Sequence, residues 1–369
     1  MARARLATAK ALPPTVALMI RRHRGRSVQG RDVAATVAGL GVAVAVLTLL
    51  VVLTGGEAVL TALGQAAPPL VAAVAAAVLA WLCLWGLTLR AVFSAAGGSL
   101  GAVDAVLVNA GAAFANHVTP FGQVGGEPLA AWLLADISGT PFERSLGTMT
   151  SFDTVNVMPS LSLAAVGLGY YASVAVLGAR LRSVAAGLAV VAVIAPVLAA
   201  LAWRYRHDVE ASLVALVAPP LRVGGRLLPV VSSPGRAAVE NRVRGFLGAI
   251  ESVATDRRRL AVALACSTAG WLAQVVGLWV ALRAVGATVP LYVPLFVVPL
   301  GAVGSAMPTP GGLGGIEPVQ VGLLTATTAA AAATVTAAVL VFSVGGYLFT
   351  TSVGAAAVAV LQVRKRTAA

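Results

Sequence analysis

The sequence has few charged residues and little of the chemistry on which soluble enzymes depend. Only 11% of its 369 residues are charged, whereas about 25% is usual in a soluble domain. Hydrophobic residues make up 59% of the chain, which contains just three histidines and two cysteines. This composition excludes an ordinary soluble domain and predicts an all-α polytopic membrane protein.

The usual motifs of metal, redox and nucleotide chemistry are also missing. The sequence contains no C-x-x-C pair, no H-E-x-x-H motif and no Walker loop. Cys83 and Cys266 lie within apolar runs, where we expect them to pack as small apolar side chains. The G-x-S-x-G spacing from Gly97 to Gly101 follows a predicted membrane helix, whereas a nucleophile elbow follows a strand. We therefore expect no cofactor and no metal, and we predict that the chain is not an enzyme.

The net charge of +13 is concentrated in three segments. Lysine and arginine gather in residues 1–32, 204–259 and 364–369, outside the long apolar runs. Nucleic-acid binding needs basic residues on one soluble face with aromatic platforms, so we predict no nucleic-acid partner. Basic segments of membrane proteins face the cytoplasm, which predicts a cytoplasmic-membrane protein with both termini cytoplasmic. Residues 1–32 lack a short apolar core with a cleavage site, so we expect a tail and not a signal peptide.

Apolar runs long enough to cross about 30 Å of hydrocarbon predict about six full spans. They are residues 33–54, 69–93, 146–173, 183–203, 260–283 and 335–361. Glycine and proline break two further apolar regions into pairs of short helices. The first pair is 103–118 with 128–137, and the second is 291–306 with 319–333. Because all three basic segments must face the cytoplasm, the number of membrane crossings between them must be even. Each pair must then enter and leave the membrane on one side, the first from the cytoplasm and the second from outside. Two short full spans in each region would also keep the number of crossings even.

The two broken regions carry one repeated motif. TPFGQVGGEP begins at Thr119 and TPGGLGGIEP begins at Thr309, and both fit T-P-x-G-x-x-G-x-E-P. We interpret each motif as the elbow of a re-entrant helical hairpin, and the units 69–173 and 260–361 as an inverted repeat. Irregular backbone at membrane depth must be protected, so we expect the two elbows to face each other. The predicted elbow residues are Thr119, Pro120, Gly122, Gly125, Gly126, Pro128, Thr309, Pro310, Gly311, Gly312, Gly314, Gly315 and Pro318.

The chain then divides into two membrane halves joined by a basic segment. The halves are residues 33–203, with motif 119–128, and residues 260–363, with motif 309–318. The segment between them, 204–259, is predicted to be cytoplasmic. Apolar residues recur within it at three- and four-residue steps from Ala237 to Arg259. That spacing predicts an amphipathic helix at the inner membrane interface, with docking of a partner as the weaker alternative.

Glu127 and Glu317 are the equivalent acids of the repeated motif. Each follows a glycine-rich turn and precedes a proline, which is a signature of a helix N-terminus. Each carboxylate can therefore cap its half-helix. Acids at membrane depth are also costly and often functional, so each can instead face a cavity that receives a headgroup or a proton. The sequence leaves both interpretations open.

Three more polar residues are candidates for substrate contact or transport. Asn116 precedes the first motif, and Asp153 and Asn156 lie one turn apart on span 146–173, where they share a helix face. His117 is interpreted as a structural residue, and Gln274 and Gln320 are weaker candidates. Four tryptophans are predicted to pack or to lie at the membrane interface: Trp81, Trp85, Trp271 and Trp279.

Three stretches carry a family resemblance: NHVTPFGQVGGEPLAAWLL, SFD and MPTPGGLGGIEPVQVGLL. They are similar to the signatures of the lysylphosphatidylglycerol synthase transmembrane-region family, and the likeness extends from about residue 33 to 361. Pro310 to Glu317 is the more specific part. Glu127 and Glu317 match motif positions, and Asp153 matches less closely. The sequence shows no soluble aminoacyl-transferase domain, so lysine transfer is not expected.

The resemblance implies a flippase-like protein that binds or moves lipids, glycolipid intermediates among them. We therefore predict a lipid translocase in which two broken-helix hairpins surround a midplane cavity, with membrane lipids as partners. A non-transporting scaffold for enzymes of envelope synthesis is the first alternative. A membrane-embedded transferase acting on a lipid-linked substrate is the second.

Overall fold

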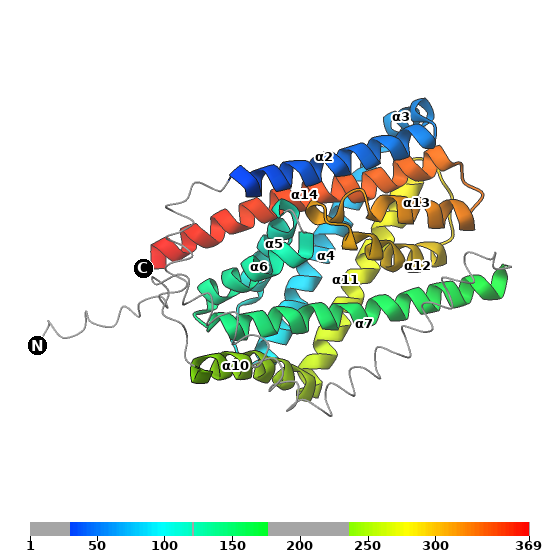
Figure 1. Cartoon of the computed structure of the whole chain (residues 1–369). Coiled ribbons are helices and arrows are strands. Elements are labelled where there is room, and N and C mark those ends of the chain that lie inside the picture. The colour runs from blue at the N-terminus through cyan, green and yellow to red at the C-terminus, as the bar shows by residue number, and fades with distance from the viewer. Residues whose placement is uncertain (1–29, 120–121, 176–235, 369) are drawn as a thin grey trace, which may run out of the picture.

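The computed structural model describes residues 30–119, 122–175 and 236–368, and within these ranges it contains helices and no strand (Figure 1). The α-helices are α2 Gly30–Leu53, α3 Gly56–Gly64, α4 Pro68–Ala95, α5 Ala102–Val118, α6 Gly122–Ser138, α7 Phe142–Val174, α10 Arg236–Thr255, α11 Arg257–Ala284, α12 Tyr292–Gly301, α13 Ile316–Thr327 and α14 Ala332–Ala368. Two short 3₁₀ helices, η1 Ala302–Ala306 and η2 Pro310–Gly312, lie between α12 and α13.

Five of these helices are long and apolar enough to cross a membrane: α2, α4, α7, α11 and α14. They agree closely with the predicted spans 33–54, 69–93, 146–173, 260–283 and 335–361. The predicted span 183–203 lies outside the described residues. Large apolar side chains are exposed along these helices, Val37 and Leu53 of α2 and Val166 of α7 among them. Such surfaces suit lipid and not water, so the chain is a multi-pass helical membrane protein.

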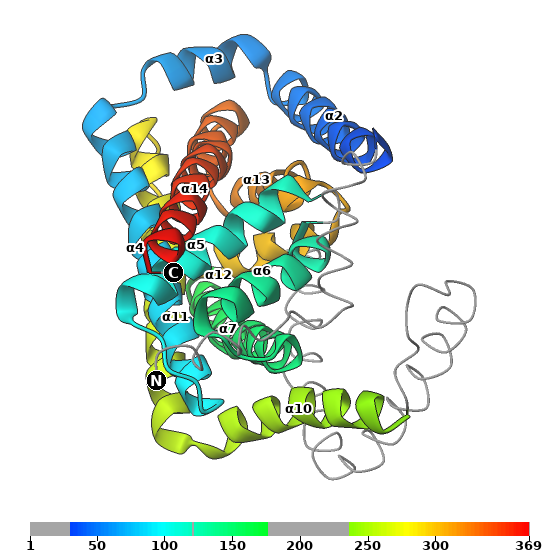
Figure 2. The same cartoon turned by 90° about the vertical axis from the view of Figure 1, so that its left-hand side faces the viewer.

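The longest contact between two helices is that of α4 with α11, which run side by side along one edge of the molecule in Figure 2, and both helices also contact α14 and α7. Small residues let these helices approach closely, as is usual between membrane helices. A Cβ atom on Gly270 of α11 would lie 2.3 Å from Cδ1 of Trp85 on α4. Phe93, Leu134 and Phe152 belong to one apolar core cluster, and Leu278 and Phe296 belong to a second.

The first broken region folds as α5 and α6, which pack against each other. The sequence predicts that the second helix of this pair starts near Pro128, but α6 already begins at Gly122 and contains Pro128. Gly126 allows close packing of the two helices: a Cβ atom there would lie 1.9 Å from Oδ1 and 2.7 Å from Cα of Asn116. The predicted elbow 119–128 is therefore wrong in its extent for this pair, because the residues from Gly122 onward belong to α6.

The second broken region keeps an irregular backbone. Between α12 and α13 the chain passes through η1 and η2, and Gly311, Gly312 and Gly314 have φ values of 63°, 72° and 81°. Side chains with a Cβ rarely adopt this conformation, so glycine is required at these positions. The 10 residues of α12 and 12 of α13 extend about 15 and 18 Å, too short to cross about 30 Å of hydrocarbon.

The open end of the α5–α6 pair lies beside the C-terminal end of α14. Arg364 pairs with Asp104 at the start of α5, with Nη1 3.0 Å from Oδ1, and Lys365 pairs with Asp136 near the end of α6. At the same end of the molecule Arg259, in the first turn of α11, donates through Nη1 to the Ser94 carbonyl oxygen of α4 at 2.7 Å. The ends of α4 and α6 and the starts of α5 and α11 thus gather around basic side chains.

The α12–α13 pair opens at the opposite end (Figure 1). There the Ala67 amide donates to the Ala284 carbonyl at 2.9 Å, which joins the start of α4 to the end of α11. The Tyr292 ring at the start of α12 lies 4.9 Å from that of Tyr170, near the end of α7. The two pairs therefore point toward each other, and η2 contacts both α5 and α6. Whether either pair is re-entrant in a bilayer stays a prediction.

The predicted amphipathic segment 237–259 is divided between two helices. α10 ends at Thr255, and the Asp256 side chain caps α11 by accepting from the Arg259 amide at 3.0 Å. α10 packs across α7 so closely that a Cβ atom on Gly147 would lie 2.5 Å from the Phe246 carbonyl oxygen. Its placement at a membrane surface stays a prediction.

Candidate functional site

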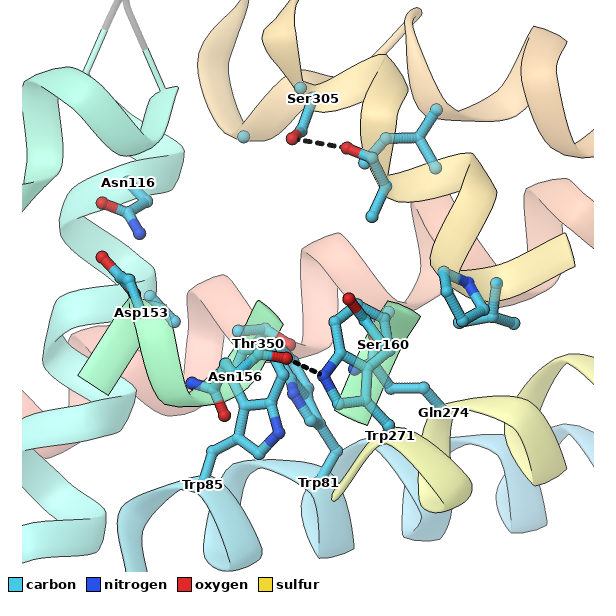
Figure 3. A pocket seen from close by; sticks show the side chains of 18 of the residues that line it. Trp81, Trp85, Asn116, Asp153, Asn156, Ser160, Trp271, Gln274, Ser305 and Thr350 are labelled. Atoms are coloured by element: carbon cyan, nitrogen blue, oxygen red, sulfur yellow. Dashed lines mark hydrogen bonds between the residues drawn. The ribbon is translucent and has the colours of Figure 1, made fainter. Parts of the chain in front are cut away.

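A cavity of about 710 Å³ lies between the two facing helix pairs and the long helices α4, α7, α11 and α14 (Figure 3). Its walls include residues near the midpoints of four long helices: Trp81 of α4, Asn156 of α7, Trp271 of α11 and Tyr347 of α14. Gly311 and Gly312 of η2 complete the wall from the side of the second motif. The cavity is therefore at mid-length of the spans, where each helix would be deepest in a bilayer.

Four of the five predicted substrate or transport residues line this cavity. They are Asn116 of α5, Glu127 of α6, and Asp153 and Asn156 of α7. Figure 3 shows Asn116 and Asp153 on neighbouring helices with their side chains close to the same open space. The spacing of Asp153 and Asn156 does place both on the cavity side of α7. The roles of these residues in transport stay predictions.

Glu317 differs from Glu127 in its surroundings. Its side chain is fully buried and is not part of the cavity wall. Its Oε2 accepts from the Gly314 amide at 2.7 Å, and its Oε1 accepts from the hydroxyl of Ser343 on α14. Glu317 therefore ties the glycine-rich turn to the first turn of α13 and to α14. Glu127, by contrast, is partly exposed and lies in the second turn of α6.

The motif residues themselves fall into distinct positions. Thr119 caps the end of α5, and Pro120 lies outside the described residues. Gly122, Gly125, Gly126 and Pro128 lie in α6; Thr309, Pro310, Gly311, Gly312, Gly314 and Gly315 form the turn before α13; Pro318 lies within α13. In the second motif the buried Thr309 hydroxyl donates to the Leu313 carbonyl at 2.7 Å, which closes the turn.

Asn156 connects two of the spans through a small polar network. The Ser267 hydroxyl on α11 donates to its Oδ1 at 2.6 Å, and the Trp271 indole nitrogen donates to its backbone carbonyl at 2.8 Å. All three residues are buried. The cavity floor between α7 and α11 is therefore held by directional bonds as well as by packing.

Three tryptophans form an aromatic wall that the sequence did not reveal. The rings of Trp81 and Trp85 are 5.3 Å apart, and those of Trp85 and Trp271 are 5.6 Å apart, both pairs edge to face. All three line the cavity. The four-residue spacing of Trp81 and Trp85 predicts that they share one face of a helix, but it does not show what that face contacts. Trp279 is elsewhere, with the Arg283 guanidinium 3.8 Å from its ring centroid.

His117 joins the first motif to α14. Its ring stacks on that of Tyr347 with centroids 4.1 Å apart, and its Nδ1 lies 2.8 Å from the Thr351 hydroxyl oxygen. The Tyr347 hydroxyl donates to the His117 carbonyl at 2.9 Å, beside the last turn of α5. These contacts fix the end of α5 against α14 directly beneath η2.

Comparison with known proteins places the chain in a family. The sequence pattern of the lysylphosphatidylglycerol synthase TM region matches residues 36–354, which include both motifs and every described residue that lines the cavity. The chain belongs to the lysylphosphatidylglycerol synthase transmembrane-region family. The chain is also similar to a UPF0104 membrane protein of Methanothermobacter thermautotrophicus. The two are 29% identical over 250 residues, which cover 65% of this chain and 69% of that protein. No solved structure matches the chain.

The described residues of this family member offer no ready metal site. Among them no group of three or more histidine, cysteine, aspartate or glutamate side chains is placed to hold a metal ion. The chemistry that the cavity does offer is hydrogen bonding, aromatic contact and the carboxyl groups of Glu127 and Asp153.

Proposed function

We propose that this chain is a lipid translocase of the cytoplasmic membrane. The supporting observation is the cavity at mid-length of the spans, which receives polar residues from two helix pairs that open at opposite ends of the molecule. Broken helices that meet from opposite sides around a central site are the arrangement by which many transporters give alternating access. A lipid headgroup would occupy the cavity while its acyl chains stay in the bilayer.

Movement in this proposal comes from the joint between the two elbows. η2 contacts α5 and α6 near His117 and Gly311, and in this proposal the two pairs shift against each other at this contact. The sequence has no Walker loop. Transport would therefore be downhill or coupled to an ion, with Glu127 and Asp153 as the acids that border the headgroup.

The orientation in the proposal follows the basic residues. Arg144, Arg259 and Arg364 lie at the end of the molecule where the α5–α6 pair opens, and the positive-inside rule favours the cytoplasm for that end. The α12–α13 pair would then open to the outside. In this proposal the chain carries a lipid and does not transform it, so it is not an enzyme.

The test is translocation of labelled lipids in proteoliposomes that contain only this protein. We expect faster leaflet exchange for one headgroup class, and slower exchange in Glu127→Gln and Asp153→Asn with the same reconstituted amount of folded protein. Glu317→Gln is also expected to reduce exchange, because Glu317 holds the glycine-rich turn before α13 in place. Absence of exchange for zwitterionic, anionic, aminoacylated, glycosyl and polyprenyl-linked lipids would reject the translocase and favour the scaffold for envelope-synthesis enzymes.

A further inference from the structure

Helix α2 is buried at one small face. Of residues 36–53, only Gly39 and Ala43 are buried, and these two lie one turn apart on the same side of the helix. Val37, Val42 and Val44, beside them in the sequence, are exposed. The first half of α2 therefore meets the molecule mainly through two small residues and turns most of its apolar surface outward.

That face rests on the glycine-rich turn of the second motif. A Cβ atom on Gly39 would lie 2.9 Å from Cδ of Pro310. A Cβ atom on Gly314 would lie 3.1 Å from Cα of Ala43 and 3.3 Å from its carbonyl oxygen. The helix and the turn approach this closely because a glycine stands on each side of the contact.

The other side of the same turn borders the cavity. Gly311, Gly312 and Leu313 line the cavity, whereas Pro310 and Gly314 contact α2. The turn therefore lies between α2 and the place proposed for the headgroup. Movement of the turn away from the cavity is blocked as long as α2 rests on it.

We propose that α2 is a latch on this turn. While Gly39 and Ala43 rest on Pro310 and Gly314, the turn is held against the cavity, and when α2 moves away the turn is free to move during transport. The inference rests on the proposed function, because it names the element that regulates access to the same cavity. It is supported by the bonding of the turn and by the place where α2 is anchored.

The backbone of the turn is hydrogen-bonded without help from α2. Four successive amides, those of residues 312–315, donate to acceptors within residues 309–317 at 3.1, 3.4, 2.7 and 3.1 Å. Backbone amides at membrane depth need such partners, and departure of α2 removes none of these four. The turn can therefore keep its bonds and move as a unit.

α2 is anchored toward its end and not at the turn. Leu50 packs against the second apolar cluster, and Gly55, with a φ of 99°, joins α2 to α3. Figure 2 shows α2 at the edge of the molecule, with α3 leading from it to α4. A rotation about this end would lift Gly39 and Ala43 from the turn. Lipid chains would replace the lost contacts, because there is little hydrophobic force between helices in a membrane.

A removable cross-link tests the latch. Gly39→Cys and Pro308→Cys would be joined by a short bis-methanethiosulfonate linker in a chain with Cys83→Ala and Cys266→Ala. The positions are close, since a Cβ atom on Gly39 would lie 3.8 Å from the Pro308 carbonyl oxygen, and Pro308 is exposed. We expect the cross-linked chain to exchange labelled lipid about tenfold more slowly than the same sample after reduction, because the turn is held.

The control for the linker is Gly39→Cys alone with the same treatment, which should exchange lipid at one rate before and after reduction. Because the cross-linked and the reduced chain are one sample, a difference between them does not come from misfolding. Equal rates in the cross-linked and the reduced chain would overturn the inference.

The position of α2 can also be measured without transport. Spin labels on Val44→Cys of α2 and Leu348→Cys of α14, both exposed positions, would report the distance between these helices in a bilayer. We expect two distances, and Gly39→Leu should raise the share of the longer one severalfold, because its side chain meets Pro310. Gly39→Ala should act in the same direction but more weakly.

Gly41→Leu is the matched control for these variants. A Cβ atom on Gly41 meets nothing within 4 Å, so the larger side chain should leave both distances and their shares unchanged. One distance shared by the unchanged chain, Gly39→Ala and Gly39→Leu would overturn the latch.

The distance and transport measurements separate the two proposals. A longer distance favoured by Gly39→Leu, in a chain that exchanges no lipid, would retain the latch and reject the translocase. Lipid exchange that the cross-link does not slow would retain the translocase and reject the latch.

Discussion

The backbone of Gly311 lies directly against the ring of His117. A Cβ atom on Gly311 would come within 2.8 Å of Cδ2 of His117 and 2.7 Å of Cε2 of Tyr347. Gly311 belongs to the second motif and His117 immediately precedes the first, so residues 194 positions apart bring the two motifs together at the edge of the cavity. The two motifs can approach this closely because Gly311 has no side chain.

Gly311→Ala is expected to destabilise the protein by at least about 1 kcal/mol. The added methyl group would meet two packed rings, and the backbone φ of 63° at this position is strained for alanine. Thermal unfolding in detergent would measure the effect. Gly322→Ala on α13 is the control, since a Cβ atom there meets nothing within 4 Å and alanine favours a helix. Equal melting temperatures for the two variants would contradict the close joint.

Glu317→Ala is expected to cost about 1–3 kcal/mol of stability. The change leaves the buried Gly314 amide and the partly buried Ser343 hydroxyl without their acceptor. Glu317→Gln should lose less, because its amide oxygen can still accept from Gly314. Glu127→Ala should also lose less, since Glu127 is partly exposed at the cavity. Chemical unfolding of the three variants would establish this order. A larger loss of stability in Glu127→Ala than in Glu317→Ala would contradict the conclusion that Glu317 is the acid that holds the fold.

Ser267→Ala tests the polar network between α7 and α11. The variant removes the donor to Asn156 Oδ1, and such bonds between membrane helices contribute about 0.6 kcal/mol on average and up to about 1.7 kcal/mol. We expect a loss within that range in an unfolding titration. Ser352→Ala, whose exposed hydroxyl bonds only within its own helix, should change stability by less than about 0.5 kcal/mol. A similar loss in both would mean that the interhelical bond contributes nothing.

The ion pairs of the C-terminal helix are expected to add little stability. Arg364 and Lys365 are more than half exposed where they pair with Asp104 and Asp136, and exposed pairs contribute about 0–1 kcal/mol. The double variant Arg364→Gln and Lys365→Gln should therefore unfold within about 1 kcal/mol of the unchanged chain at low salt. At 1 M salt the difference should disappear, because charges are screened over about 3 Å. A loss of several kcal/mol that persists in high salt would show that the pairs anchor the helix.

The long helices follow from apolar length alone, and the sequence located all five that the structure describes as candidate spans. Helix 68–95, for example, begins with two prolines and consists of uninterrupted apolar sequence around Trp81 and Trp85. Such a run has few alternatives in a membrane, because only a helix satisfies its own backbone there. Periodicity also placed Asp153 and Asn156 on one face, and that face borders the cavity.

The motifs show where sequence reasoning fails. Both contain the same glycine pattern, yet Gly126 is helical and packs on Asn116, whereas Gly311 has positive φ in a turn. Glycine is used both for unusual backbone angles and for close contact, and the local sequence does not distinguish these uses. The aromatic wall was missed for a related reason. The direction in which a helix turns its tryptophans is set by its neighbours, which the sequence alone does not specify.

The contact of Arg364 and Lys365 with Asp104 and Asp136 has a practical consequence for topology mapping. These pairs hold the end of α14 beside the start of α5 and the end of α6. A protease site or a thiol label placed after Arg366 would therefore report the compartment of three helix ends in one experiment. If that label is reached from the cytoplasm, the α5–α6 pair opens to the cytoplasm as well, and the α12–α13 pair at the other end of the molecule opens to the outside.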